Sequence, residues 1–158
     1  MIAATLKTAR AIANLKDGVI VATVEIAASP ERVFRALTTA ELAQWWGEEG
    51  DYRVTAYKAD LRVGGAWIST GRSADGTEFS VSGTILEIEP PRRLVQTWKY
   101  DWEGGGETTL TYQLESIEGG TRLTARHEGF TDPKAAESHA FGWEKVLGWL
   151  VAHLGRNL

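Results

Sequence analysis

Residues 107–129, ETTLTYQLESIEGGTRLTARHEG, alternate polar and apolar side chains on both sides of the glycine pair Gly119-Gly120. A period of two is typical of strands with one buried and one solvated face. Strands joined by so short a connection run antiparallel. The stretch therefore predicts two neighbouring antiparallel strands, 107–117 and 121–129.

Similar segments continue towards the amino terminus. Runs rich in β-branched and aromatic residues lie between turn residues such as Asp75-Gly76 and Pro90-Pro91. Such runs are typical of strands. They predict five more strands, at 19–27, 52–59, 65–71, 78–88 and 93–101.

Three helices are expected. Ser29-Pro30 has the residue types of a helix cap and first turn, and predicts a helix to about Thr39. A second short helix follows and ends at Trp45-Trp46-Gly47. After Asp132-Pro133 the spacing predicts one long helix to about Leu154. Its apolar stripe consists of His139, Trp143, Val146, Leu147, Leu150 and Leu154.

This layout predicts an α+β fold in one domain, residues 19–158, preceded by a tail or short helix over 1–18. Seven strands make a sheet roughly 29 Å wide at about 4.8 Å spacing. One helix with its side chains is only about 10–12 Å across. We therefore expect an antiparallel sheet that curls around the long helix and leaves an internal cavity.

Composition excludes several classes of function. The chain has 158 residues, a formal charge of −4 and no cysteine. The acidic balance disfavours a general nucleic-acid binder, and the lack of thiols excludes cysteine nucleophiles and cysteine-ligated metals. No apolar stretch is long enough for a membrane span, and the amino terminus lacks the pattern of a secretory signal. We expect a soluble cytoplasmic protein, either a monomer or a homodimer.

Strand alternation predicts which side chains surround the cavity. Seven tryptophans are more than one small core requires, and tryptophan favours pocket walls. We expect the short helices to form the cavity mouth with Phe34, Trp45 and Trp46. The expected wall residues are Trp67, Gln96, Trp98, Tyr100, Tyr112, His127 and Trp143.

Several motifs resemble those of the START-like, or SRPBCC, superfamily with its helix-grip fold. Within it, the chain is similar to small bacterial homologues of the heat-shock protein 90 ATPase activator. The resemblance covers about residues 19–154. The residues that carry it are Ser29-Pro30-x-x-Val33-Phe34, Trp45-Trp46, Asp60-x-Arg62-x-Gly64-Gly65-x-Trp67, Gly83-Thr84-Ile85-Leu86-Glu87-Ile88-x-Pro90-Pro91-x-x-Leu94-Val95-x-x-Trp98, Thr121-x-Leu123-Thr124-x-x-His127-x-Gly129-Phe130 and Gly142-Trp143-x-x-x-Leu147.

The resemblance implies a curved sheet wrapped around the long carboxy-terminal helix. It implies a ligand cavity, because members of the superfamily bind lipids, sterols, polyketides or hormones there, and some are cyclases or hydrolases. The resemblance to the activator also implies a chaperone partner and a role in the stress response. The activator carries an additional amino-terminal domain that contacts the chaperone, whereas only 18 residues precede the predicted domain here.

Two polar residues inside the predicted cavity allow different interpretations. His127 is a candidate acid–base residue of a cyclase or hydrolase, or a structural histidine hydrogen-bonded to a neighbouring backbone group or to a ligand's oxygen. Gln96 either orients a ligand's carbonyl or hydroxyl, or bonds to a tryptophan N–H. Asp60 and Arg62 are placed to form an ion pair.

We expect no metal, because the histidine and carboxylate spacing of common metal sites is absent, and no cofactor. The leading hypothesis is binding of a small hydrophobic or amphipathic molecule. Acid–base catalysis and chaperone association are the alternatives.

Overall fold

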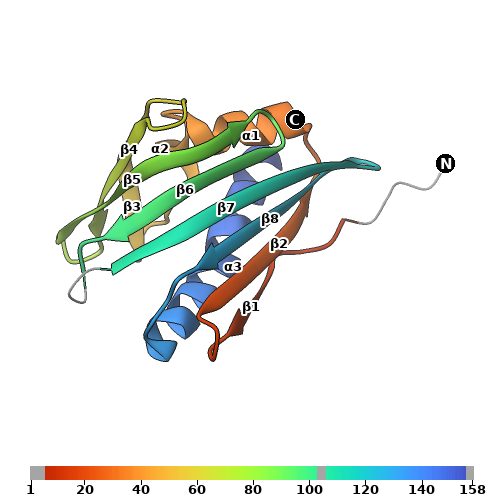
Figure 1. Cartoon of the computed structure of the whole chain (residues 1–158). Helices are drawn as coiled ribbons and strands as arrows, with labels where there is room; N and C mark the ends of the chain where they lie inside the picture. Colours follow the sequence, from red (N-terminus) through yellow and green to blue (C-terminus); the bar gives the residue numbers. More distant parts are fainter. Residues whose placement is uncertain (1–5, 103–105, 156–158) are drawn as a thin grey trace.

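The computed structural model describes residues 6–102 and 106–155 (Figure 1). Its antiparallel sheet has the strand order β1-β2-β8-β7-β6-β5-β4-β3. The elements are β1 (Arg10–Asn14), β2 (Val19–Ile26), α1 (Pro30–Thr38), α2 (Leu42–Trp45), β3 (Tyr52–Ala59), β4 (Ala66–Ser73), β5 (Glu78–Glu89), β6 (Arg93–Tyr100), β7 (Gly106–Ile117), β8 (Gly120–Glu128) and α3 (Pro133–Gly155). The predicted α+β fold is confirmed, and every expected strand agrees with an observed one to within two residues.

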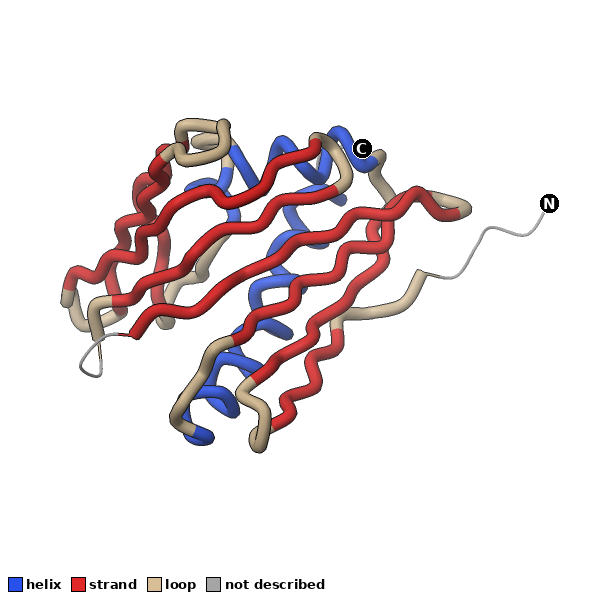
Figure 2. Tube along the Cα trace, in the orientation of Figure 1, coloured by secondary structure: helices blue, strands red, loops and turns tan. Residues whose placement is uncertain are grey.

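The helices lie on one face of the sheet, and α3 runs along its concave side (Figure 2). α1 and α2 carry the chain from β2 to β3, which forms the far edge of the sheet. The Ser29 hydroxyl accepts a hydrogen bond from the Arg32 backbone N–H at 3.2 Å, so Ser29 caps α1 as predicted. Of the described helices, none is long and apolar enough to cross a membrane.

The amino-terminal segment differs from the prediction of a tail or short helix. Residues Arg10–Asn14 form β1, which makes the sheet eight-stranded, whereas residues 1–5 lie outside the described part. β1 pairs with β2 from Arg10↔Thr23 to Asn14↔Val19. Its alternate small residues, Ala11 and Ala13, pack against the core. This tertiary packing overrides the helical propensity of alanine.

Strand alternation assigns the inner face of β6, β7 and β8 correctly. Leu110, Tyr112 and Leu114 of β7 are each at most 3% exposed. The inner residues of β8 and β6 are also buried, as is most of the predicted stripe of α3. The sheet therefore presents a mainly apolar surface to the helices.

Candidate functional site

A cavity of about 780 Å³ lies between the concave face of the sheet and helices α2 and α3. Its walls contain nine aromatic side chains among the described residues, and most of them come from β3 to β7. These are Trp46, Tyr52, Tyr57, Trp67, Phe79, Trp98, Trp102, Tyr112 and Trp143. Its volume is within the range of roughly 300–1,000 Å³ usual for small-molecule pockets.

Six of the ten predicted site residues line this cavity. The structure brings together Trp46, Trp67, Gln96, Trp98, Tyr112 and Trp143. Phe34, Trp45, Tyr100 and His127 are buried but are not among the described residues of its wall. Trp45 packs between helices instead, where its indole N–H donates to the Ala36 carbonyl at 2.9 Å. Tyr100 turns its ring over Gly106 at the end of the sheet.

Trp67 reaches its place by crossing a glycine in the neighbouring strand. Its indole N–H on β4 passes over Gly83 of β5 and donates to the Thr97 carbonyl of β6 at 3.0 Å. A Cβ atom at Gly83 would lie 2.7 Å from Trp67 Nε1 and 2.0 Å from the Thr97 oxygen. Gly83 is therefore required for the position of this part of the wall.

His127 lies behind the wall, with both ring nitrogens in hydrogen bonds. Trp143 Nε1–H donates to His127 Nδ1 at 3.0 Å, so Nδ1 carries no proton. The Thr108 hydroxyl donates to the Trp98 carbonyl at 3.0 Å and therefore accepts from His127 Nε2–H at 2.6 Å. These partners fix one neutral tautomer.

The environment also keeps His127 neutral. The side chain is 0% exposed, and burial holds the pKa of His127 well below its ordinary value, with a smaller effect from the charge of His139. Its ring is 5.9 Å from that of His139 and 4.8 Å from that of Trp98. His127 therefore acts as a positioning residue that holds Trp143 and packs against Trp98. This geometry favours the structural interpretation over acid–base catalysis.

Alternation did not identify Tyr57 as a wall residue, because β3 contains a bulge. The register between β3 and β4 shifts between Val54 and Ala56. One additional residue there places Val54 and Tyr57, three positions apart, on the same inner face. Period-two analysis cannot locate such an insertion, and the sequence around it carries no glycine that would signal it.

The inner part of the cavity contains polar groups as well as aromatic rings. Gln96 is 4% exposed and lines the cavity, and its amide makes no hydrogen bond to another described residue. The alternative of a bond to a tryptophan N–H is therefore not realised within the described part of the chain. Burial raises the pKa of Tyr57 and Tyr112, so both phenols are neutral hydrogen-bonding groups at neutral pH.

The mouth of the cavity carries carboxylates. Asp51, Asp75, Glu78 and Asp101 belong to its lining. Asp51 forms an ion pair with Lys145 of α3, which ties the segment before β3 to the helix. Nearby, Trp46 donates its indole N–H to the Tyr52 hydroxyl at 3.1 Å, and burial raises the pKa of Tyr52 to about 12.

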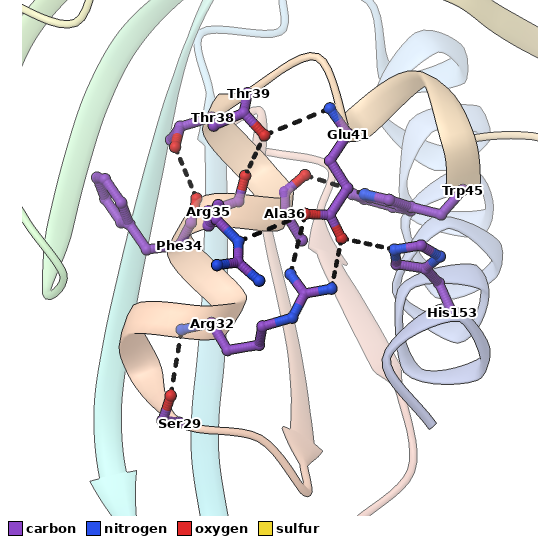
Figure 3. Close-up of polar contacts among 10 residues, drawn as sticks. All are labelled: Ser29, Arg32, Phe34, Arg35, Ala36, Thr38, Thr39, Glu41, Trp45 and His153. Atoms are coloured by element: carbon purple, nitrogen blue, oxygen red, sulfur yellow. Dashed lines mark hydrogen bonds and ion pairs between the residues drawn. The ribbon is translucent and has the colours of Figure 1, made fainter. Parts of the chain in front are cut away.

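A charged cluster around Glu41 lies at the start of α2, the short helix that ends just before Trp46 (Figure 3). The Glu41 carboxylate accepts from both terminal nitrogens of Arg32, at 3.0 and 2.6 Å, and lies 2.7 Å from His153 Nε2 on α3. Burial alone would raise the pKa of Glu41, but hydrogen bonds and charges from Arg32 and His153 hold it below its ordinary value. The cluster links α1, the start of α2 and α3 at one end of the cavity.

The sequence raised two questions about charged groups: an ion pair between Asp60 and Arg62, and a metal site. Asp60 and Arg62 do form the expected ion pair, at 2.7 Å, on the exposed loop before β4. Within the described ranges, no three histidine, aspartate or glutamate side chains are grouped as metal ligands.

Comparison with known proteins identifies relatives of the same fold. The family model for "Activator of Hsp90 ATPase homolog 1-like protein" matches residues 27–155. The crystal structure of a protein from Rhodobacter sphaeroides is similar to this chain, with 25% sequence identity and a TM-score of 0.80. The alignment covers 95% of this chain and 99% of that chain. No curated protein matches the sequence.

Two further solved structures agree. The AHSA1 protein from Silicibacter pomeroyi has 29% identity and a TM-score of 0.75, with 89% of this chain and 99% of that chain covered. A protein from Chromobacterium violaceum has 31% identity and a TM-score of 0.73, with 85% and 95% covered.

Proposed function

The chain belongs to the family of Activator of Hsp90 ATPase homolog 1-like proteins, and we propose that it binds a small hydrophobic or amphipathic molecule in its aromatic cavity. The observation that carries this proposal is the cavity of about 780 Å³, with the buried amide of Gln96 inside it. Apolar walls with a few polar groups are characteristic of small-molecule sites. Tryptophan-rich walls contribute a large apolar contact area to such a ligand.

The position of His127 supports binding over acid–base catalysis. A general base must reach the proton that it removes. Both nitrogens of His127 are occupied by Trp143 and Thr108, and the ring is 0% exposed. In the proposed function, His127 holds Trp143 in the wall, and Trp98 contacts the ligand.

The test compares Trp98→Ala with Leu123→Ala. Both residues are buried, but only Trp98 belongs to the cavity wall. Each substitution should cost several kcal/mol of stability, about 2–5 for the leucine and 3–5 for the tryptophan. Binding of the uncharged fluorophore N-phenyl-1-naphthylamine is measured by titration, and the melting temperature is measured in parallel.

We expect Trp98→Ala to weaken probe binding at least tenfold, and Leu123→Ala to change it less than threefold. Equal effects of the two variants on binding would assign Trp98 to the core and overturn the proposal. Stimulation of a chaperone ATPase by this chain, without probe binding, would favour the partner role instead.

A further inference from the structure

Four polar side chains face the cavity without a protein partner. They are Tyr57, Ser69, Gln96 and Tyr112, all cavity-lining and none more than 8% exposed. The side-chain hydrogen bonds of the described residues include none from these four. Every fully buried side-chain nitrogen or oxygen in the described ranges nevertheless has a partner. The polar atoms of these four side chains therefore reach the open space of the cavity.

The four groups come from two pairs of neighbouring strands, β3 with β4 and β6 with β7, which are separated by β5. Tyr57 and Ser69 are directly opposite each other on β3 and β4. On β6 and β7, Leu94 is opposite Tyr112 and Gln96 is opposite Leu110, so Gln96 and Tyr112 are diagonal neighbours. The Tyr57 and Tyr112 phenols are close enough that Tyr57 adds to the burial effect that raises the pKa of Tyr112.

The charges of the lining disfavour an anionic ligand. The described lining residues include Asp51, Asp75, Glu78 and Asp101 but no lysine or arginine. Asp51 is paired with Lys145 and Glu78 with Arg72, and His139 is the one basic side chain of the described lining. An entering carboxylate would therefore pass the negative Asp75 and Asp101 and would meet no lysine or arginine among the described lining residues. Burying an unpaired charge is strongly unfavourable.

We propose that the ligand is a ring compound with an uncharged hydroxyl or carbonyl at its buried end, that Gln96 and Tyr112 bind this end, and that carboxylated analogues are rejected. This inference rests on the proposed function and specifies its ligand class. An amide both donates and accepts, so Gln96 suits either group. A buried site built for hydrogen bonding discriminates against ligands that leave it unsatisfied.

The experiment uses displacement of N-phenyl-1-naphthylamine by naphthalenes that differ in one substituent. The competitors are naphthalene, 2-naphthol, 2-acetonaphthone and 2-naphthoate, at pH 7.5. They are measured on the wild type, Gln96→Leu and Tyr112→Phe. Gln113→Leu is the matched control, because Gln113 lies on the exposed face of β7. Melting temperatures show whether each variant is folded.

In the wild type and Gln113→Leu, we expect 2-naphthol and 2-acetonaphthone to bind at least tenfold more tightly than 2-naphthoate. We also expect the affinity ratio of 2-naphthol to naphthalene to fall at least fivefold in Gln96→Leu. Tyr112→Phe, which keeps the ring, should lower this ratio to a smaller extent.

Tight binding of 2-naphthoate, or an unchanged ratio in both cavity variants, would overturn the ligand class while leaving the proposed function in place. Failure of the fluorophore itself to bind the wild type would overturn the proposed function and this inference together.

Discussion

His127, Gln96 and Trp98 are all buried on the inner face of the sheet, but only Gln96 and Trp98 belong to the cavity wall. His127 is covered because α3 brings Trp143 over β8. Trp98, on the same face of β6 as Gln96, remains in the lining. The difference depends on where the helix lies, which is a tertiary property that local pattern does not contain.

Burial of His127 makes the stability of the fold depend on pH. The unfolded chain binds a proton at His127 below the ordinary pKa of 6.5, whereas the folded chain does not, because burial lowers the pKa. The folded state is therefore not penalised by neutral His127 above pH 6.5, and the free energy of unfolding decreases as the pH falls below this value. We expect the wild type to lose on the order of 1 kcal/mol more than His127→Gln between pH 7.5 and 5.5.

Urea unfolding at the two pH values measures this difference. Equal losses in the wild type and in His127→Gln would show that His127 takes up its proton in the folded state.

At the scale of elements, irregularities of the strands determine the shape of the wall. The bulge in β3 brings Tyr57 inward, and Gly83 lets Trp67 cross β5. The sequence predicts the strands because their alternation is long. It does not predict the bulge. It also misses β1, a strand of only five residues, two of which are alanine.

Two glycine substitutions should have opposite effects. Gly83→Ala puts a methyl group 2.0 Å from the Thr97 oxygen, and we expect it to destabilise the fold by about 1–3 kcal/mol and to weaken probe binding. Gly148 lies on the exposed side of α3, and a Cβ atom added there would meet no atom within 4 Å outside the helix's own backbone and the adjoining residues. We expect Gly148→Ala to stabilise the fold by about 0.5–1 kcal/mol. Chemical unfolding of both variants tests the prediction, and a neutral Gly83→Ala would refute the close approach.

The Glu41 cluster should stabilise the helix junction more than an exposed ion pair does. We expect Glu41→Gln to cost about 1–3 kcal/mol, since it removes the charge that Arg32 and His153 face. Asp60→Asn, which breaks the exposed pair with Arg62, should cost less than about 0.5 kcal/mol.

The pH dependence of stability shows whether the effect of Glu41→Gln comes from the lost charge. Its pKa in the folded chain lies below the ordinary value of 4.5, so its stabilising effect is present above pH 4.5 and is lost at lower pH. The stability difference between the wild type and Glu41→Gln should narrow in acid. A constant difference would indicate a packing effect instead of a charge effect.

At the scale of the whole molecule, the eight-stranded sheet is much wider than the single helix α3 that lies against it (Figure 1). The arithmetic of sheet width and helix diameter predicts this arrangement and its cavity from the sequence. The volume and the four polar groups inside depend on side-chain packing across five strands and three helices. Those features follow only from the folded structure.

The most direct test of ligand binding is to locate the bound molecule by nuclear Overhauser effects. The full chain is saturated with N-phenyl-1-naphthylamine, and contacts from the probe to protein side chains are recorded by NMR. We predict contacts to Trp67, Trp98 and Tyr112 of the cavity wall. Contacts confined to exposed side chains such as Ile12 and Phe141, or no binding, would contradict it.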